Sequence, residues 1–90
     1  MITEEIVLDR DSVDLIQELN KDFPTWTIKN MGSGRHYHFI SKDRKEKGVL
    51  EITFPEDLGD RVVLKIADNR KSSWSLKALT QLKSYLKSYK

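Results

Sequence analysis

The stretch that decides the fold is Val49-Leu50-Glu51-Ile52-Thr53-Phe54, together with the similar run Arg61-Val62-Val63-Leu64-Lys65-Ile66-Ala67 that follows it. Apolar residues recur at every second position in both runs, which is typical of strands with one buried face. The connection between them, residues 55–60, is short and contains Pro, Gly and Asp, so it favours a tight antiparallel turn. These runs predict two paired strands of a sheet that is apolar on one side.

Two more strand-like runs precede this pair, residues 25–31 and 35–41. Gly32-Ser33-Gly34 separates them as a turn, and the charged stretch 43–48 leads on to Val49. Because short connections favour pairing between neighbours in the sequence, we expect four antiparallel strands in a meander.

Helical spacing appears on both sides of the strands. Residues 11–23 predict a helix that begins at Asp11 as the N-cap and ends before Pro24. Residues 73–89 predict a second helix, because leucines recur at intervals of three and four after a cap at Ser72 or Ser73. The fold class is therefore α+β: one domain over residues 1–90, built as a two-layer sandwich in which a four-stranded antiparallel meander is flanked by an N-terminal and a C-terminal helix. A short extra strand at Ile6-Val7-Leu8 stays open.

Alternation also predicts which side chains share the polar face of the sheet. Those expected away from the helices are Thr27, Lys29, His36, His38, Ile40, Glu51, Thr53, Val63 and Lys65.

Composition excludes several classes of protein. The chain has no Cys, so it has no disulfides, no thiolate nucleophile and no Cys-ligated zinc site. Its acidic beginning and lack of a long apolar run predict a cytoplasmic protein with no signal peptide and no membrane contact.

His36-Tyr37-His38 contains both histidines of the chain. Two histidines two residues apart on a strand point the same way and could share a divalent metal, but Glu51 is the only obvious third ligand on that face. Because zinc sites generally use three or four protein ligands, we expect no metal site and no cofactor. An imidazole at this position is also suited to proton transfer near neutral pH.

The run from Ser12 to Pro55 resembles the HicA family of small mRNA interferases. The similarity is carried by a leading helix with a Trp after it, by Gly34-Arg35-His36-Tyr37-His38-Phe39 and by Ile52-Thr53-Phe54-Pro55. It implies a fold like the double-stranded RNA-binding domain, and RNA cleavage with His36 as the catalytic histidine. Arg35 stands where the family usually has Ser, and the chain after Pro55 departs from the family pattern.

Charge is unevenly distributed. Residues 1–24 hold seven acids and two bases, whereas residues 25–90 hold seven acids and fourteen bases. A basic region can bind the phosphate backbone of a nucleic acid, although lysines near a helix C-terminus also suit the helix dipole. The candidate nucleic-acid-binding residues are Lys29, Arg35, Lys65, Arg70, Lys71 and Lys77.

Three functions are compatible with these sequence features. We favour a small non-enzymatic module that contacts RNA or DNA through its basic C-terminal region and polar sheet face. The alternatives are a HicA-like ribonuclease and a protein-binding adaptor or inhibitor of bacterial or phage origin. Exposed sheet edges also leave a homodimer open.

Overall fold

The computed structural model describes residues 1–7, 12–32, 35–55 and 61–88. Strand β1 covers Ile2–Val7 and helix α1 covers Ser12–Asp22. Strands β2, β3, β4 and β5 follow at Trp26–Asn30, His36–Ser41, Leu50–Thr53 and Arg61–Ile66. A single 3-10 turn, η1, spans Asp68–Arg70, and helix α2 spans Ser73–Lys87.

The predicted α+β class is confirmed, but the sheet has five strands instead of four. The order is β1-β5-β4-β3-β2, and all four pairings are antiparallel. The four-stranded meander is therefore correct in its order and incomplete at one edge. Segment Ile2–Val7 pairs along the whole of β5, with Ile6 opposite Val62. Its buried residue, Ile6, joins the core, which explains why a segment with two adjacent glutamates still forms a strand.

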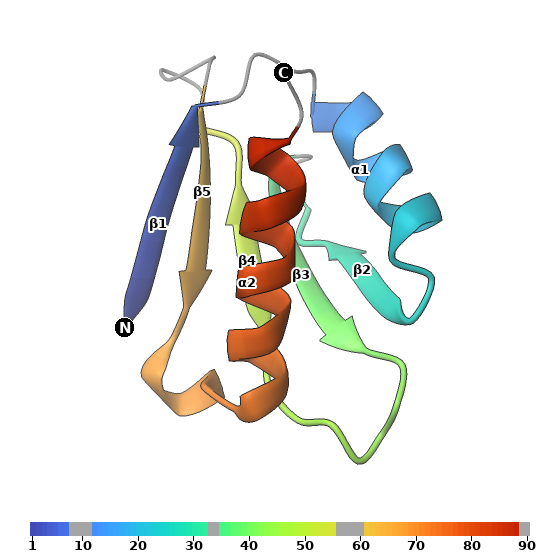
Figure 1. The fold of residues 1–90 in the computed structure, drawn as a ribbon, viewed down its shortest axis with the longest axis vertical. Coiled ribbons are helices and arrows are strands. Elements are labelled where there is room, and N and C mark those ends of the chain that lie inside the picture. Colours follow the sequence, from blue (N-terminus) through green and yellow to red (C-terminus); the bar gives the residue numbers. More distant parts are fainter. Residues whose placement is uncertain (8–11, 33–34, 56–60, 89–90) are drawn as a thin grey trace.

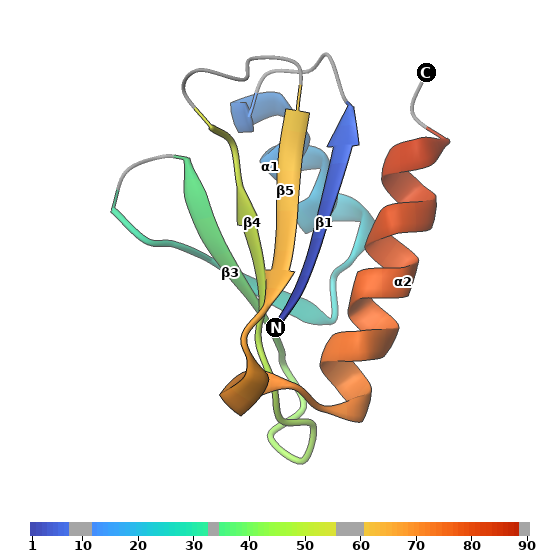
Figure 2. The ribbon, with the colours of Figure 1, turned by 90° about the vertical axis from the view of Figure 1, so that its left-hand side faces the viewer.

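Both helices lie on one face of the sheet (Figures 1 and 2). Alternate strand residues fill the space between the layers. The fully or almost fully buried ones are Tyr37, Phe39, Leu50, Ile52, Val62, Leu64 and Ile66. Helix α1 contributes Leu15 and Leu19, and α2 contributes a stripe that includes Ala78, Leu82 and Leu86. Leu76, which the leucine spacing placed in that stripe, is 37% exposed.

The aromatic residues pack between the helices and the sheet. The ring of Trp26 stacks on Phe23 at 4.2 Å between centroids and meets Trp74 edge-on at 5.8 Å. Both tryptophans are more than nine-tenths buried. They are core residues and leave no stacking platform for a base at these positions.

Helix α2 begins as predicted, with Ser72 as its N-cap. The Ser72 Oγ accepts from the Ser75 N–H at 3.0 Å, and the Ser75 Oγ accepts from the Ser72 N–H at 2.7 Å. This reciprocal pair is a capping box. The predicted cap of the first helix, Asp11, lies outside the described residues. No helix in the described ranges combines the length and the apolar character needed to cross a bilayer.

Candidate functional site

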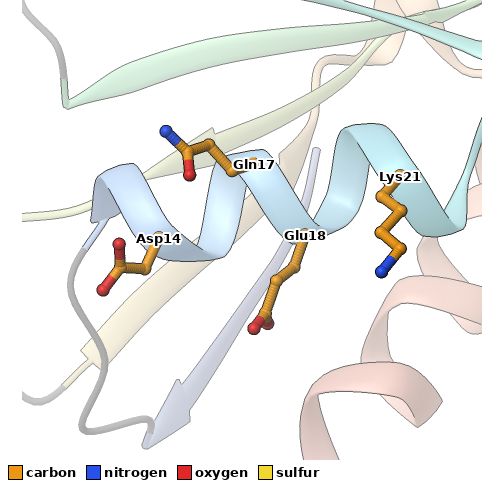
Figure 3. Close-up of a pocket in the computed structure, with 4 residues that line it drawn as sticks. All are labelled: Asp14, Gln17, Glu18 and Lys21. Carbon is orange, nitrogen blue, oxygen red and sulfur yellow. The ribbon is translucent and has the colours of Figure 1, made fainter.

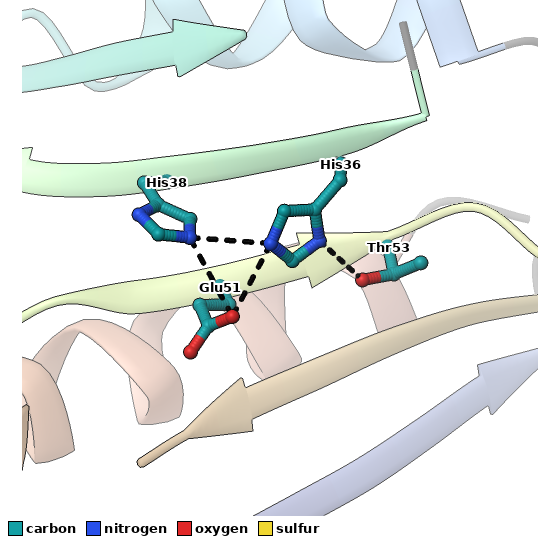
Figure 4. A network of polar contacts seen from close by, with 4 residues as sticks. All are labelled: His36, His38, Glu51 and Thr53. Atoms are coloured by element: carbon teal, nitrogen blue, oxygen red, sulfur yellow. Dashed lines mark hydrogen bonds and ion pairs between the residues drawn. The ribbon is translucent and has the colours of Figure 1, made fainter. Parts of the chain in front are cut away.

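The face of the sheet opposite the helices, which we call the open face, carries both histidines. His36 and His38 alternate on β3 and therefore point to the same side. On the neighbouring strand β4, Thr53 lies opposite His36 and Glu51 lies opposite His38. Strand register thus gathers two imidazoles, a carboxylate and a hydroxyl from residues up to 17 positions apart in the sequence (Figure 4).

Three of these side chains converge on a common point. The Nε2 atoms of His36 and His38 are 3.2 Å apart. Glu51 Oε1 lies 3.2 Å from the first of these atoms and 3.5 Å from the second. The three ligating atoms form a nearly equilateral triangle, and we call these residues the triad.

The fourth residue orients one member of the triad. His36 Nδ1 lies 2.8 Å from Thr53 Oγ1, a hydrogen-bond distance. Because this contact uses Nδ1, the other ring nitrogen of His36 is directed at Glu51 and His38.

The triad is partly shielded from water. The exposed fraction of the side chain is 33% for His36, 16% for His38 and 14% for Glu51, so the site opens on the His36 side. The pKa of His38 is lowered from its ordinary value of 6.5, chiefly by burial. Glu51 acts in the opposite direction, while the charges of His36 and Arg70 lower this pKa further. His38 is therefore biased toward the neutral imidazole, the form that binds metals and accepts protons.

Cations flank the triad on the two neighbouring strands, β2 and β5. Lys29 on β2 pairs with His38, and Lys65 on β5 pairs with Glu51. Arg70, just beyond β5, is close enough for its charge to act on His38. Of the six predicted nucleic-acid-binding residues, Lys29, Lys65 and Arg70 are thus associated with the open face.

The other three predicted residues are not strand partners of the triad. Arg35 directly precedes β3, so it lies at the opposite end of this strand from the loop that follows Ser41. Its guanidinium lies 3.5 Å from the carbonyl oxygen of Phe54. Lys77 is exposed on α2, in the helix layer. Lys71 lies between η1 and α2. The structure therefore does not unite the six predicted residues on one surface.

A second group of cations combines the predicted Arg70 and Lys71 with bases of the β3–β4 loop that were not predicted. The loop between β3 and β4 meets the segment between η1 and α2, because Ser72 Oγ donates to the carbonyl of Lys47 and the Val49 N–H donates to that of Arg70 at 3.3 Å. Gly48 permits this approach: its φ is 110°, and a Cβ there would lie 3.0 Å from the Arg70 carbonyl oxygen. The two segments lie together at one end of the molecule (Figures 1 and 2).

We call this region the basic end. Its exposed bases are Lys42, Arg44, Lys45, Lys47, Arg70 and Lys71. Its three acids, Asp43, Glu46 and Asp68, all have partners: Asp43 accepts from the Lys45 N–H, Glu46 accepts from Ser41 Oγ, and Asp68 pairs with the N-terminal ammonium. The signal for this region in the sequence is the charged stretch 43–48, which was predicted only as a connection between two strands.

A separate hollow of about 320 Å³ lies along α1. Asp14, Gln17, Glu18 and Lys21 line it, all from one helix (Figure 3). These residues repeat at helical intervals on α1, and none of them belongs to the triad or the basic end.

Comparison with protein-family models, curated proteins and solved structures finds no significant match.

Proposed function

We propose that the protein binds nucleic acid through its phosphate backbone, at the basic end and the adjoining part of the open face. The observation that carries this proposal is the contact between Lys47 and Ser72, which joins two basic segments 25 residues apart. It collects six bases and three acids in one region. An excess of cations attracts phosphates regardless of base sequence.

The charges continue from the basic end onto the sheet. Arg70 belongs to the basic end and also acts electrostatically on His38. Lys29 and Lys65 extend the positive charge across the strands on either side of the triad. A single-stranded or looped RNA lying along this path would contact phosphate-binding cations over both regions.

The experiment compares two charge-matched double variants. Lys47→Gln/Lys71→Gln removes two charges from the basic end, whereas Lys83→Gln/Lys87→Gln removes two from the last turns of α2. Binding of labelled single-stranded and hairpin RNA is followed by fluorescence anisotropy at several salt concentrations. The basic-end variant should bind RNA more weakly. The slope of log K against the logarithm of salt concentration should also become less negative by about 1.4, because each lost phosphate contact on a single strand contributes about 0.7.

The α2 variant should behave like the unmodified protein. Equal losses in the two variants would show a general charge effect and contradict the proposed surface. Absence of binding by the unmodified protein at low salt would also contradict it, and would favour the adaptor function.

Ribonuclease activity is the second candidate, favoured by the surroundings of His36. The resemblance to the HicA family marks this residue as catalytic, and its one-third exposed imidazole lies 3.2 Å from a carboxylate oxygen of Glu51. A carboxylate beside an imidazole supports proton transfer. Incubation of the same RNAs with the unmodified protein and with His36→Ala tests this: cleavage that is lost in the variant, with RNA affinity kept, supports the activity.

A further inference from the structure

We propose that the triad of His36, His38 and Glu51 is a binding site for a divalent transition metal of the zinc class. This reverses the prediction made from the sequence, where Glu51 was the only obvious third ligand and no metal site was expected. The site is independent of nucleic-acid binding, since it rests on the geometry of three side chains on β3 and β4.

The spacing of the ligating atoms fits tetrahedral coordination. Zinc binds imidazole nitrogen and carboxylate oxygen at about 2.0–2.2 Å, so two ligands of a tetrahedral site are separated by about 3.3–3.6 Å. The three separations in the triad are 3.2, 3.2 and 3.5 Å. A zinc ion could therefore be bound with little movement of any of the three side chains.

Ligand chemistry selects the same class of metal. Two imidazoles and one carboxylate suit zinc and its neighbours among the transition metals, whereas magnesium and calcium prefer sites made entirely of oxygen. Two histidines and a glutamate form a ligand set known in zinc enzymes, with the fourth position taken by water or substrate.

Proton accounting gives a second argument. Three atoms that can each carry a lone pair lie within 3.5 Å of one another. If both imidazoles are neutral and His36 donates its Nδ1 proton to Thr53, His36 Nε2 carries no proton. At most one proton, on His38 Nε2, is then available for the three contacts among His36, His38 and Glu51. A divalent cation between the three atoms satisfies them together.

The scaffold holds the ligands in place before any metal binds. The β3–β4 ladder fixes the backbone of all four residues, and the buried side chains Tyr37, Phe39, Leu50 and Ile52 anchor the other face of the two strands. Thr53 fixes the ring orientation of His36, which is the role that the outer hydrogen bond of a metal-bound histidine usually has.

The flanking cations oppose this site and also indicate what occupies its fourth position. Lys29, Lys65 and Arg70 repel a metal ion, but solvent screens much of this repulsion near the surface. The same three charges favour an anionic fourth ligand, such as a phosphate oxygen. The greater exposure of His36 places the open position on its side of the triad.

Zinc titration of the untagged full chain by isothermal calorimetry tests the proposal. We expect one zinc per chain with a micromolar or lower Kd at neutral pH, and a Kd at least about tenfold higher for Glu51→Gln. Glu5→Gln is the matched control, because Glu5 lies on the open face at β1 and the same charge is removed there. That variant should bind zinc as the unmodified protein does.

Cobalt supplies a second readout that does not depend on calorimetry. His36 and His38 are the only histidines, and the chain lacks Cys, so a tetrahedral cobalt spectrum can only arise with these imidazoles. Intense visible absorption that disappears in His38→Gln supports the site, provided circular dichroism shows that the variant is folded. Zinc should also raise the Tm of the unmodified protein, and at the same zinc concentration it should raise that of Glu51→Gln less.

Two results would overturn the proposal. One is a Kd in the millimolar range for the unmodified protein. The other is a zinc affinity that Glu51→Gln and Glu5→Gln affect equally.

Discussion

Thr53 Oγ1 lies 2.8 Å from His36 Nδ1, across the β3–β4 pair. The two residues are directly opposite one another in the register, so the hydrogen bond follows from strand pairing. This hydrogen bond also affects the triad, because it determines which nitrogen of the His36 imidazole faces Glu51 and His38. A threonine with no ligating role thereby controls the geometry of a candidate metal site.

Removing this hydrogen bond should weaken metal binding without removing a ligand. Thr53→Val keeps the shape and β-propensity of the side chain but abolishes the hydroxyl. The zinc Kd should rise by about tenfold, which is typical for the loss of an outer-shell partner. Thr53→Ser, which keeps the hydroxyl, should bind nearly as well as the unmodified protein. Equal affinities of the Val and Ser variants would contradict the orienting role.

Lys65 should oppose metal binding through its charge. It pairs with Glu51 in the register, and removal of its charge should strengthen zinc binding. Repulsion between a lysine and a divalent ion near the surface predicts a Kd about two- to tenfold lower for Lys65→Gln. Arg61→Gln, on the same strand and face, is the control and should have a smaller effect. Weaker zinc binding by Lys65→Gln would be the contrary result.

Zinc and RNA should bind cooperatively if both proposals hold. A bound zinc converts the net charge of the triad from negative to positive at a point flanked by Lys29 and Lys65. RNA affinity measured by anisotropy should therefore rise when zinc is added and fall when a chelator removes it. The Glu51→Gln variant should lose this response. An RNA affinity that is indifferent to zinc in the unmodified protein would show that the triad lies outside the RNA path.

Metal-free protein should lose stability in mild acid because of His38. The pKa of this imidazole is lowered from 6.5 in the folded state, so the unfolded chain takes up the proton first as pH falls. The free energy of unfolding should be highest above about pH 6.5 and should decrease below it, until the pH passes the folded-state pKa. The charged and titratable groups around His38 are Lys29, His36, Glu51, Lys65 and Arg70.

Urea unfolding over this pH range, with a chelator present, checks the prediction. His38→Gln, which cannot titrate at this position, should show a smaller decrease between neutral pH and mild acid. Parallel profiles for the two proteins would assign the acid sensitivity to other groups.

Ser72 should couple the stability of α2 to the basic end. Ser72→Ala removes the acceptor for the Ser75 N–H and the donor to the Lys47 carbonyl. We expect a loss of about 1–2 kcal/mol in the free energy of unfolding, measured with urea. Ser84→Ala, at an exposed position of the same helix, should change it by less than about 0.5 kcal/mol. If the contact between Ser72 and the Lys47 carbonyl positions the bases of the basic end, RNA binding should weaken in Ser72→Ala and not in Ser84→Ala.

Much of the fold could be predicted because its signals are local. Alternation in residues 49–54 and 61–67 predicted two strands and their buried faces, and Pro24 and Ser72 marked the ends of helices. The N-terminal strand was harder to predict, since Glu4 and Glu5 have little intrinsic preference for a strand. Pairing with β5 and burial of Ile6 stabilise it, and these are contacts with residues more than fifty positions away.

The sequence by itself determined the α+β class, the two helices, the central antiparallel strands and the common face of His36 and His38, because each depends on periodicity along the chain. Only the tertiary structure decided that Glu51 and Thr53 lie within bonding distance of those imidazoles, and that Lys47 meets Ser72. Strand register and loop contacts set these distances. Both arise from the packing of the whole core, so short-range patterns carry little information about them.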